Sequence, residues 1–238
     1  SSIMQQLFNS VDVAIVGHFV NSQALAAVGS NAPVISLLIN LFMGVSMGAN
    51  VIISNHIGQK DGRGIQDAIG TVAVVAVASG LALMLIGLSV ARPLLTLIGT
   101  PPDVLPMAVA YLRTFFLGMP FFMVFDFGAA ILRSKGDTRR PLYILFIAGI
   151  VNTMLNLVFV LVFHAGVVGV AIATDIANAV SAIMIVWLLM KEKEPYTLHL
   201  KQMSMKWGEL KRMLQIGIPA GVQGMVFSVS NVLLQSAI

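Results

Sequence analysis

Residues 142–163 read LYILFIAGIVNTMLNLVFVLVF, and residues 166–190, after a gap of two positions, read GVVGVAIATDIANAVSAIMIVWLLM. Asp175 is the only Asp, Glu, Lys or Arg in either stretch. A helix that crosses the hydrocarbon core of a bilayer needs roughly 20 predominantly apolar residues. The two stretches therefore predict a pair of membrane-spanning helices joined by a short turn.

The same pattern recurs along the whole chain of 238 residues. Apolar residues make up 58% of the chain and charged residues 10%, whereas about 25% of the residues in globular domains are charged. Seven segments have the composition of a membrane-spanning helix: 1–17, 31–55, 68–91, 114–132, 142–163, 166–190 and 214–238. We therefore expect an all-α membrane protein.

Lys and Arg crowd into alternate gaps between these segments. The gaps 56–67, 133–140 and 191–213 carry all of the 14 Lys and Arg residues except Arg92 and Arg113. Because basic loops stay on the cytoplasmic side of a membrane, these three gaps are predicted to be cytoplasmic. A multi-pass protein follows, with its N-terminus in the cytoplasm.

Composition also excludes several classes of function. The pI near 9.6 does not indicate a nucleic-acid partner, because the basic residues are spread over short loops next to helix ends. The chain has no cysteine, so a disulfide framework, a thiolate metal site and a Cys nucleophile are excluded. The four histidines lie in the gaps and far apart in the sequence, namely at His18, His56, His164 and His199. Neither an enzyme nor a cofactor is expected.

The chain divides at its longest basic gap. We expect residues 1–190 to form a six-helix transmembrane lobe whose first helix is truncated, and residues 214–238 to be the truncated start of a second lobe. Between them, residues 191–213 are expected to form a cytoplasmic linker. Trp207 and Leu210 fall at helical spacing there, which predicts a short amphipathic helix; a solvated connector is the alternative.

A weak internal echo supports the division into lobes. Residues 223–230 (QGMVFSVS) match residues 5–12 (QQLFNSVD) at a Gln, a Ser and a Val. A six-helix unit that ends in the cytoplasm and restarts with the same orientation is what a parallel internal repeat requires. Chance similarity between two apolar helices is the alternative.

Three acids lie within the apolar segments, which hold no Lys or Arg: Asp12, Asp126 and Asp175. An ionised carboxylate at membrane depth is costly, so each must be protonated, bound to a cation or close to water. Reversible binding of a proton or Na⁺ is therefore the leading functional hypothesis. Asp12 is the strongest candidate, and Na⁺ is the metal ion it would bind.

Depth along the helices groups some of the polar residues. Asp12, Asn156 and Thr174 each lie about 7 residues, or roughly 10 Å, from the predicted outer end of their segment. Asn152 shares a helix face with Asn156, and Asn178 shares one with Thr174. The predicted coupling site is thus a layer in the outer half of the membrane.

Other roles stand beside the coupling hypothesis. An intramembrane Asn often serves only to hydrogen-bond a neighbouring helix. Asp175 points roughly 100° away from Thr174 around the helix, so we class Asp175 and Asn178 as secondary candidates. Asp126 lies near the predicted inner end at Arg133 and belongs to another layer, where snorkelling toward water or an interhelical contact would also explain it.

Two pairs of glycines have the spacing that lets helices approach closely. Gly44 and Gly48 lie four residues apart, as do Gly217 and Gly221. GxxxG spacing allows one helix backbone to lie against another. We expect a packing role for both pairs.

A series of short motifs runs in one order over nearly the whole chain. They begin with NSVDVAIVGHFV at residues 9–20 and continue at residues 24–29, 44–50, 57–61, 131–139, 166–174 and 216–219. In that order they resemble the multidrug and toxic compound extrusion (MATE) transporters.

The resemblance implies a full-length protein of twelve helices in two six-helix lobes around a V-shaped cavity. It implies export of drugs and other toxic organic compounds in exchange for H⁺ or Na⁺, by a protein of the bacterial cytoplasmic membrane that is a monomer when full-length. It also implies that Asp12, Asn152 and Thr174 bind the coupling cation. Many relatives have a second Asp where this chain has Asn156, which offers a carbonyl oxygen but cannot titrate.

A flippase of related architecture that moves lipid-linked oligosaccharides is the main alternative. It would require cationic residues facing the central cavity to hold a pyrophosphate group, and the predicted segments contain none. A non-transporting receptor or scaffold is disfavoured by the unpaired acids. The substrate and the choice between H⁺ and Na⁺ stay open at this point.

Overall fold

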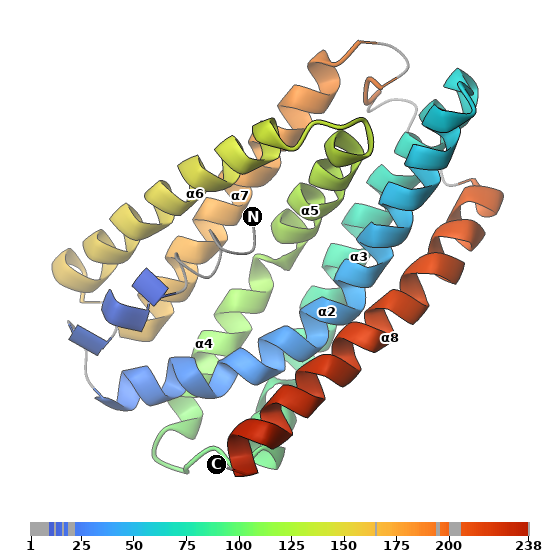
Figure 1. Ribbon diagram of the computed structural model, residues 1–238. Helices are drawn as coiled ribbons and strands as arrows, with labels where there is room; N and C mark the ends of the chain where they lie inside the picture. Colours follow the sequence, from blue (N-terminus) through green and yellow to red (C-terminus); the bar gives the residue numbers. More distant parts are fainter. Residues whose placement is uncertain are drawn as a thin grey trace.

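The structure is a computed structural model that describes residues 10–11, 13–15, 17–18, 22–164, 166–193, 196–199 and 206–237. All regular structure in these ranges is helical, and Figure 1 shows long helices side by side in a bundle. The described residues of the expected first segment, within 10–18, are helical. Asp12 lies outside the described residues.

The helices follow one another along the chain, and the longest interval lies between α7 and α8. They are α2 (Ser22–Gly58), α3 (Gly62–Leu97), α4 (Leu105–Leu117), α5 (Met119–Ser134), α6 (Arg139–Leu157), the π-helix η1 (Val158–Val162), α7 (Gly166–Lys191) and α8 (Trp207–Ala237). Within the described residues, five helices are long and apolar enough to cross a membrane, and the bent pair α4 and α5 brings the number to six if it is counted as one span. The expected class, an all-α membrane protein, is confirmed.

The span expected at residues 114–132 differs from the structure. It begins at Leu105 and consists of α4 and α5, which are bent by 48° relative to each other. The bend falls at Gly118, two residues before Pro120 in the first turn of α5, where proline removes one backbone hydrogen bond. Arg113 lies within α4, although the predicted span begins only at residue 114.

Two other boundaries also differ. α2 begins at Ser22, inside the gap predicted at residues 18–30. Trp207 and Leu210, which carry the spacing expected of a short amphipathic helix, belong to the first turns of α8. A helix that leaves the membrane keeps its backbone hydrogen bonds, so it can continue past the apolar segment.

We call the end of the bundle that holds the α2–α3 and α5–α6 turns the basic end. The α3–α4 and α6–α7 turns lie at the opposite end (Figure 1). At the basic end, His56 Nε2 lies 2.8 Å from Glu209 Oε1 and its Nδ1 lies 3.6 Å from Asp61 Oδ2. The histidine thereby links the end of α2 to the start of both α3 and α8.

Glycines let α2 and α8 pack backbone against backbone, side by side as Figure 1 shows. A Cβ added to Gly44 would lie 2.2 Å from the Gly221 nitrogen, and one added to Gly48 would lie 2.3 Å from the Met213 carbonyl oxygen. A Cβ on Gly217 would lie 2.6 Å from the Val45 Cα. The packing role expected for both glycine pairs is confirmed.

Glycines of α3 make room for the bent span in a similar way. A Cβ on Gly80 would lie 2.4 Å from the Cα of Pro120, and one on Gly87 would lie 2.2 Å from the ring of Phe116. Phe116 is fully buried. The bend between α4 and α5 is thus packed against a groove in α3.

Alanine at Gly44 is expected to destabilise the protein. Its methyl group would overlap the α8 backbone, at a cost of about 1–3 kcal/mol, which exceeds the helix propensity that alanine gains over glycine, up to about 1 kcal/mol. Gly44→Ala should therefore lower the thermal unfolding midpoint of the purified protein in detergent.

Gly58→Ala is the matched control on the same helix, because a Cβ there has nothing within 4 Å. It should leave the midpoint unchanged or raise it slightly. An equal midpoint for Gly44→Ala and the wild type would contradict the close crossing.

Candidate functional site

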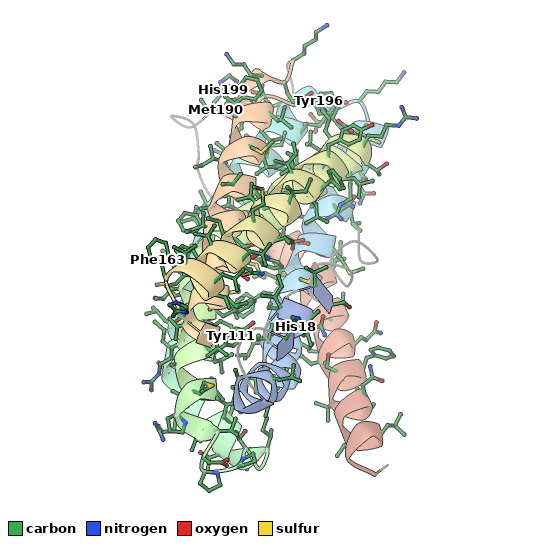
Figure 2. All side chains as sticks on the ribbon, turned by 90° about the vertical axis from the view of Figure 1, so that its left-hand side faces the viewer. His18, Tyr111, Phe163, Met190, Tyr196 and His199 are labelled. Atoms are coloured by element: carbon green, nitrogen blue, oxygen red, sulfur yellow. The ribbon has the colours of Figure 1, made fainter. Side chains whose placement is uncertain are left out.

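A small apolar cluster at the end opposite the basic end joins the first segment and the start of α2 to α4, η1 and α7, with Leu157 of α6 packed against it. Its buried members are Ile15, Ala24, Tyr111, Val160, Val167, Val170 and Ala171. Figure 2 shows the labelled Tyr111 and His18 in this half of the molecule, far from Met190, Tyr196 and His199. The cluster defines the level at which the predicted coupling layer should lie.

Both predicted asparagines of α6 are buried. Asn152 is 8% exposed and Asn156 is fully buried, one helical turn apart. Leu157, the neighbour of Asn156, packs against the apolar cluster. Two amide side chains therefore lie inside the bundle close to the level that the depth argument predicts.

The helix changes its winding directly after Asn156. Residues Val158–Val162 form the π-helix η1, and the chain then turns through His164 and Gly166, which have positive φ angles of 51° and 65°. Single π-turns within helices occur often at functional sites. Hydrophobic periodicity does not reveal a π-turn, so sequence reasoning missed this feature.

The residues predicted on α7 are half-buried: Thr174, Asp175 and Asn178. The Thr174 hydroxyl donates to the Val170 carbonyl at 3.1 Å, and Val170 belongs to the apolar cluster. Thr174 therefore lies one turn from that cluster, as Asn156 does from the α6 side. Its oxygen keeps a lone pair that could face a cation.

Asp175 has a different neighbour. A Cβ added to Gly118 would lie 2.2 Å from Asp175 Oδ1, so this carboxylate lies against the bend between α4 and α5. That direction agrees with the prediction that Asp175 points away from Thr174. Within the described residues, Oδ1 accepts no hydrogen bond.

α6 and α7, which carry Asn156 and Thr174, pack along each other. Leu157, next to Asn156, and Val170, whose carbonyl accepts from Thr174, both belong to the apolar cluster or pack against it. Asp12 lies outside the described residues, so its role stays a prediction. In the described part of the chain, no three His, Cys, Asp or Glu side chains form a group that could hold a metal ion.

Asp126 lies in another layer, as expected. It is 8% exposed, and its Oδ1 lies 4.0 Å from Nη2 of Arg133, two turns further along α5. Both residues line a cavity between α2, α5 and α8. Sequence reasoning placed Asp126 near the inner end of its helix but did not place it in a cavity.

Ion pairs tie α6 to α7 at the basic end. Glu192 accepts hydrogen bonds from Lys135 and Arg140, and Arg140 also pairs with Asp137. The Lys135 ammonium lies 4.9 Å from the ring centroid of Tyr196, one of the residues labelled at this end in Figure 2. These ion pairs therefore hold α6 and α7 together at the basic end, whereas the predicted layer lies toward the opposite end.

The carboxyl groups of this network titrate below their usual range. Burial raises the pKa of Glu192, but hydrogen bonds from Lys135 and Arg140 outweigh that effect and hold the pKa below its ordinary value of 4.5. The pKa of Asp137 is lowered in the same way: burial raises it, and hydrogen bonds from Arg140 outweigh the burial. Both groups therefore stabilise the folded protein in their ionised form.

Comparison with known proteins gives one consistent result. The MatE family model matches residues 1–158. The chain is 26% identical over 236 residues to the probable multidrug resistance protein YpnP of Bacillus subtilis, covering 99% of this chain and 52% of the relative. It is 27% identical to the probable multidrug resistance protein NorM of Thermotoga maritima, covering 95% and 49%.

Solved structures agree. The chain matches a crystal structure of MATE in the bent conformation with a TM-score of 0.90 at 26% identity, covering 98% of this chain and 52% of that one. It matches a MOP superfamily transporter from Pyrococcus furiosus with a TM-score of 0.89 at 26% identity, covering 99% and 52%. The chain spans about half the length of the relatives it matches.

Glu192→Gln is expected to lower the thermal unfolding midpoint of the purified protein at neutral pH by roughly 2–8 °C, because Lys135 and Arg140 lose a charged acceptor. A lowered carboxyl pKa stabilises the fold fully above the unfolded value of 4.5, and that stabilisation is lost as the pH falls through the folded value.

Midpoints of wild type and variant should therefore converge as the pH is lowered below 4.5. Lys193→Gln is the control, since it removes an exposed charge at the next position. If the difference in unfolding midpoint between Glu192→Gln and the wild type did not change with pH, the role of the ionised carboxylate would be contradicted.

Proposed function

The chain belongs to the MatE family, and from that membership we propose that it is the N-terminal half of a secondary multidrug efflux antiporter. The observation that carries the proposal is the match of nearly the whole chain to one half of MATE structures. Relatives named as multidrug resistance or export proteins support small organic compounds as substrates. The protein is not an enzyme.

The proposed organisation follows the basic gaps. Residues 1–190 form the first lobe, residues 191–213 the linker, and residues 214–238 the start of the second lobe. The full-length protein is a monomer of the bacterial cytoplasmic membrane. Its basic end faces the cytoplasm, because the Lys and Arg residues gather in the loops at that end.

The coupling site of this proposal is the layer of Asp12, Asn152, Asn156 and Thr174. Asp12 is the charged member of this proposed site. The other members are the two buried asparagines of α6 and the Thr174 hydroxyl, which donates to the Val170 carbonyl. Because Asn156 cannot titrate, Asp12 alone takes up a proton, or all four residues offer oxygens to Na⁺. H⁺ and Na⁺ both fit this set of oxygens.

Binding at this layer drives transport by changing which lobe arrangement is favoured. A cation that enters from outside neutralises Asp12 and lowers the cost of packing its carboxylate among the helices. The ligand can shift the equilibrium only by as much as its affinity differs between the two arrangements. Drug and cation thus alternate, each released on the side that the other enters from.

Efflux of the cationic dye ethidium tests the proposal. The full-length protein is expressed in efflux-deficient cells, and the H⁺ and Na⁺ gradients are collapsed separately. Asp12→Asn should reduce efflux by at least about tenfold, because the titratable group is lost. Efflux by the wild type should fall with one of the two gradients.

Asp103→Asn is the matched control, since Asp103 is an exposed acid at the end opposite the basic end. It should transport as the wild type does. Gradient-dependent efflux by Asp12→Asn would remove Asp12 from the mechanism. Failure of the wild type to export any cationic dye would favour the flippase alternative.

A further inference from the structure

A cavity of about 410 Å³ opens between α2, α5 and α8, in a layer separate from the predicted coupling site. Its volume is within the range of about 300–1,000 Å³ that is typical of small-molecule sites. α2 contributes Asn40, Met43, Met47 and Asn50 at helical spacing, α5 contributes Asp126, and α8 contributes the small residue Ala220.

The Asp126 carboxylate is built into the wall of this cavity with one oxygen unused. Asp126 is 8% exposed as a whole residue, and its side chain is 11% exposed. Oδ2 is buried and accepts no hydrogen bond in the described part of the chain. A buried carboxylate oxygen without a donor is costly, so a ligand that brings an N–H group gains that interaction.

Arg133 partly neutralises the negative charge of Asp126 but does not hydrogen-bond its carboxylate. The 4.0 Å between Nη2 and Oδ1 is longer than a hydrogen bond. The arginine side chain is 36% exposed and can turn toward water, whereas Asp126 cannot. An entering cation can therefore replace Arg133 as the partner of the carboxylate.

The remaining wall suits an organic body instead of a metal ion. Met43 and Met47 offer flexible thioethers, which adapt to varied apolar shapes, and Met47 is 59% exposed. Ca²⁺ takes six to eight oxygen ligands, but the cavity offers a single carboxylate. The chemistry that fits is a protonated amine attached to an apolar group.

We propose that this cavity is a substrate-loading subsite in which Asp126 binds the ammonium group of an amphiphilic amine. The proposal rests on the efflux function proposed above and adds a specificity-determining residue to it. Asp126 lies roughly 10 Å along α5 from Arg133, on the side of the basic end. The subsite therefore receives substrate from the cytoplasmic half, while Asp12 lies in the outer layer.

The test is equilibrium binding to the purified full-length protein, without any ion gradient. The probes are dansylcadaverine, a fluorescent primary amine that is cationic at neutral pH, and its neutral N-acetyl form. Wild type should prefer the amine by about tenfold, the value of a charged hydrogen bond. Asp126→Asn should abolish that preference and leave the affinity for the acetylated probe within about twofold.

Three further variants separate direct contact from structural support. Asp126→Glu should keep the preference, and Asp103→Asn should not change it. Arg133→Gln should bind the amine at least as tightly as the wild type, because a competing cation is removed. Equal loss of preference in Arg133→Gln and Asp126→Asn would reveal an ion pair that only holds the helix, and would overturn the proposal.

Met47→Trp tests the cavity even if Asp126→Asn fails to fold. The indole would fill the cavity from an exposed position on α2, and both probes should bind at least about tenfold more weakly. Unchanged binding in Met47→Trp, or no amine preference in the wild type, would overturn the subsite. The binding assay uses no ion gradient. Its outcome therefore does not depend on whether Asp12→Asn abolishes ethidium efflux.

Discussion

Every backbone N–H and C=O group of a chain inside a bilayer must find its partner within the protein, and this requirement shapes the whole molecule. It accounts for the exclusively helical structure of the described residues. Because the lipid tails are as apolar as the side chains, helices gain no hydrophobic energy by associating, and close packing decides which of them touch. Glycines allow this close packing at two places: where α2 crosses α8, and where Gly80 and Gly87 of α3 face the α4–α5 bend.

The sequence predicts the fold class and most spans, because a bilayer imposes a simple rule on length and polarity. What it misses are features that do not change hydropathy: the bend at Gly118, the π-turn after Leu157 and the extension of α8 to Trp207. Most of α4 is also missing from the predicted span, which begins directly after Arg113. Local backbone geometry follows from packing against α3, which lies far away in the sequence.

For the candidate site too, the sequence predicts some features and misses others. Helical spacing alone places Asn152 and Asn156 on one face, and both are buried on α6. The orientation of Asp175 toward the α4–α5 bend also agrees with its angle around α7. The cavity at Asp126 could not be anticipated, because its walls come from three helices that are remote in the chain. The sequence gives the depth of a residue in the membrane but not its neighbours.

α8 is a single helix of 31 residues, or about 46 Å in length. Pro219 lies within it, between the two glycines that hold it against α2. A proline in a helix interior removes one backbone hydrogen bond, so bending costs least there. The place along α8 where a bend costs least thus coincides with its glycine-mediated contact with α2.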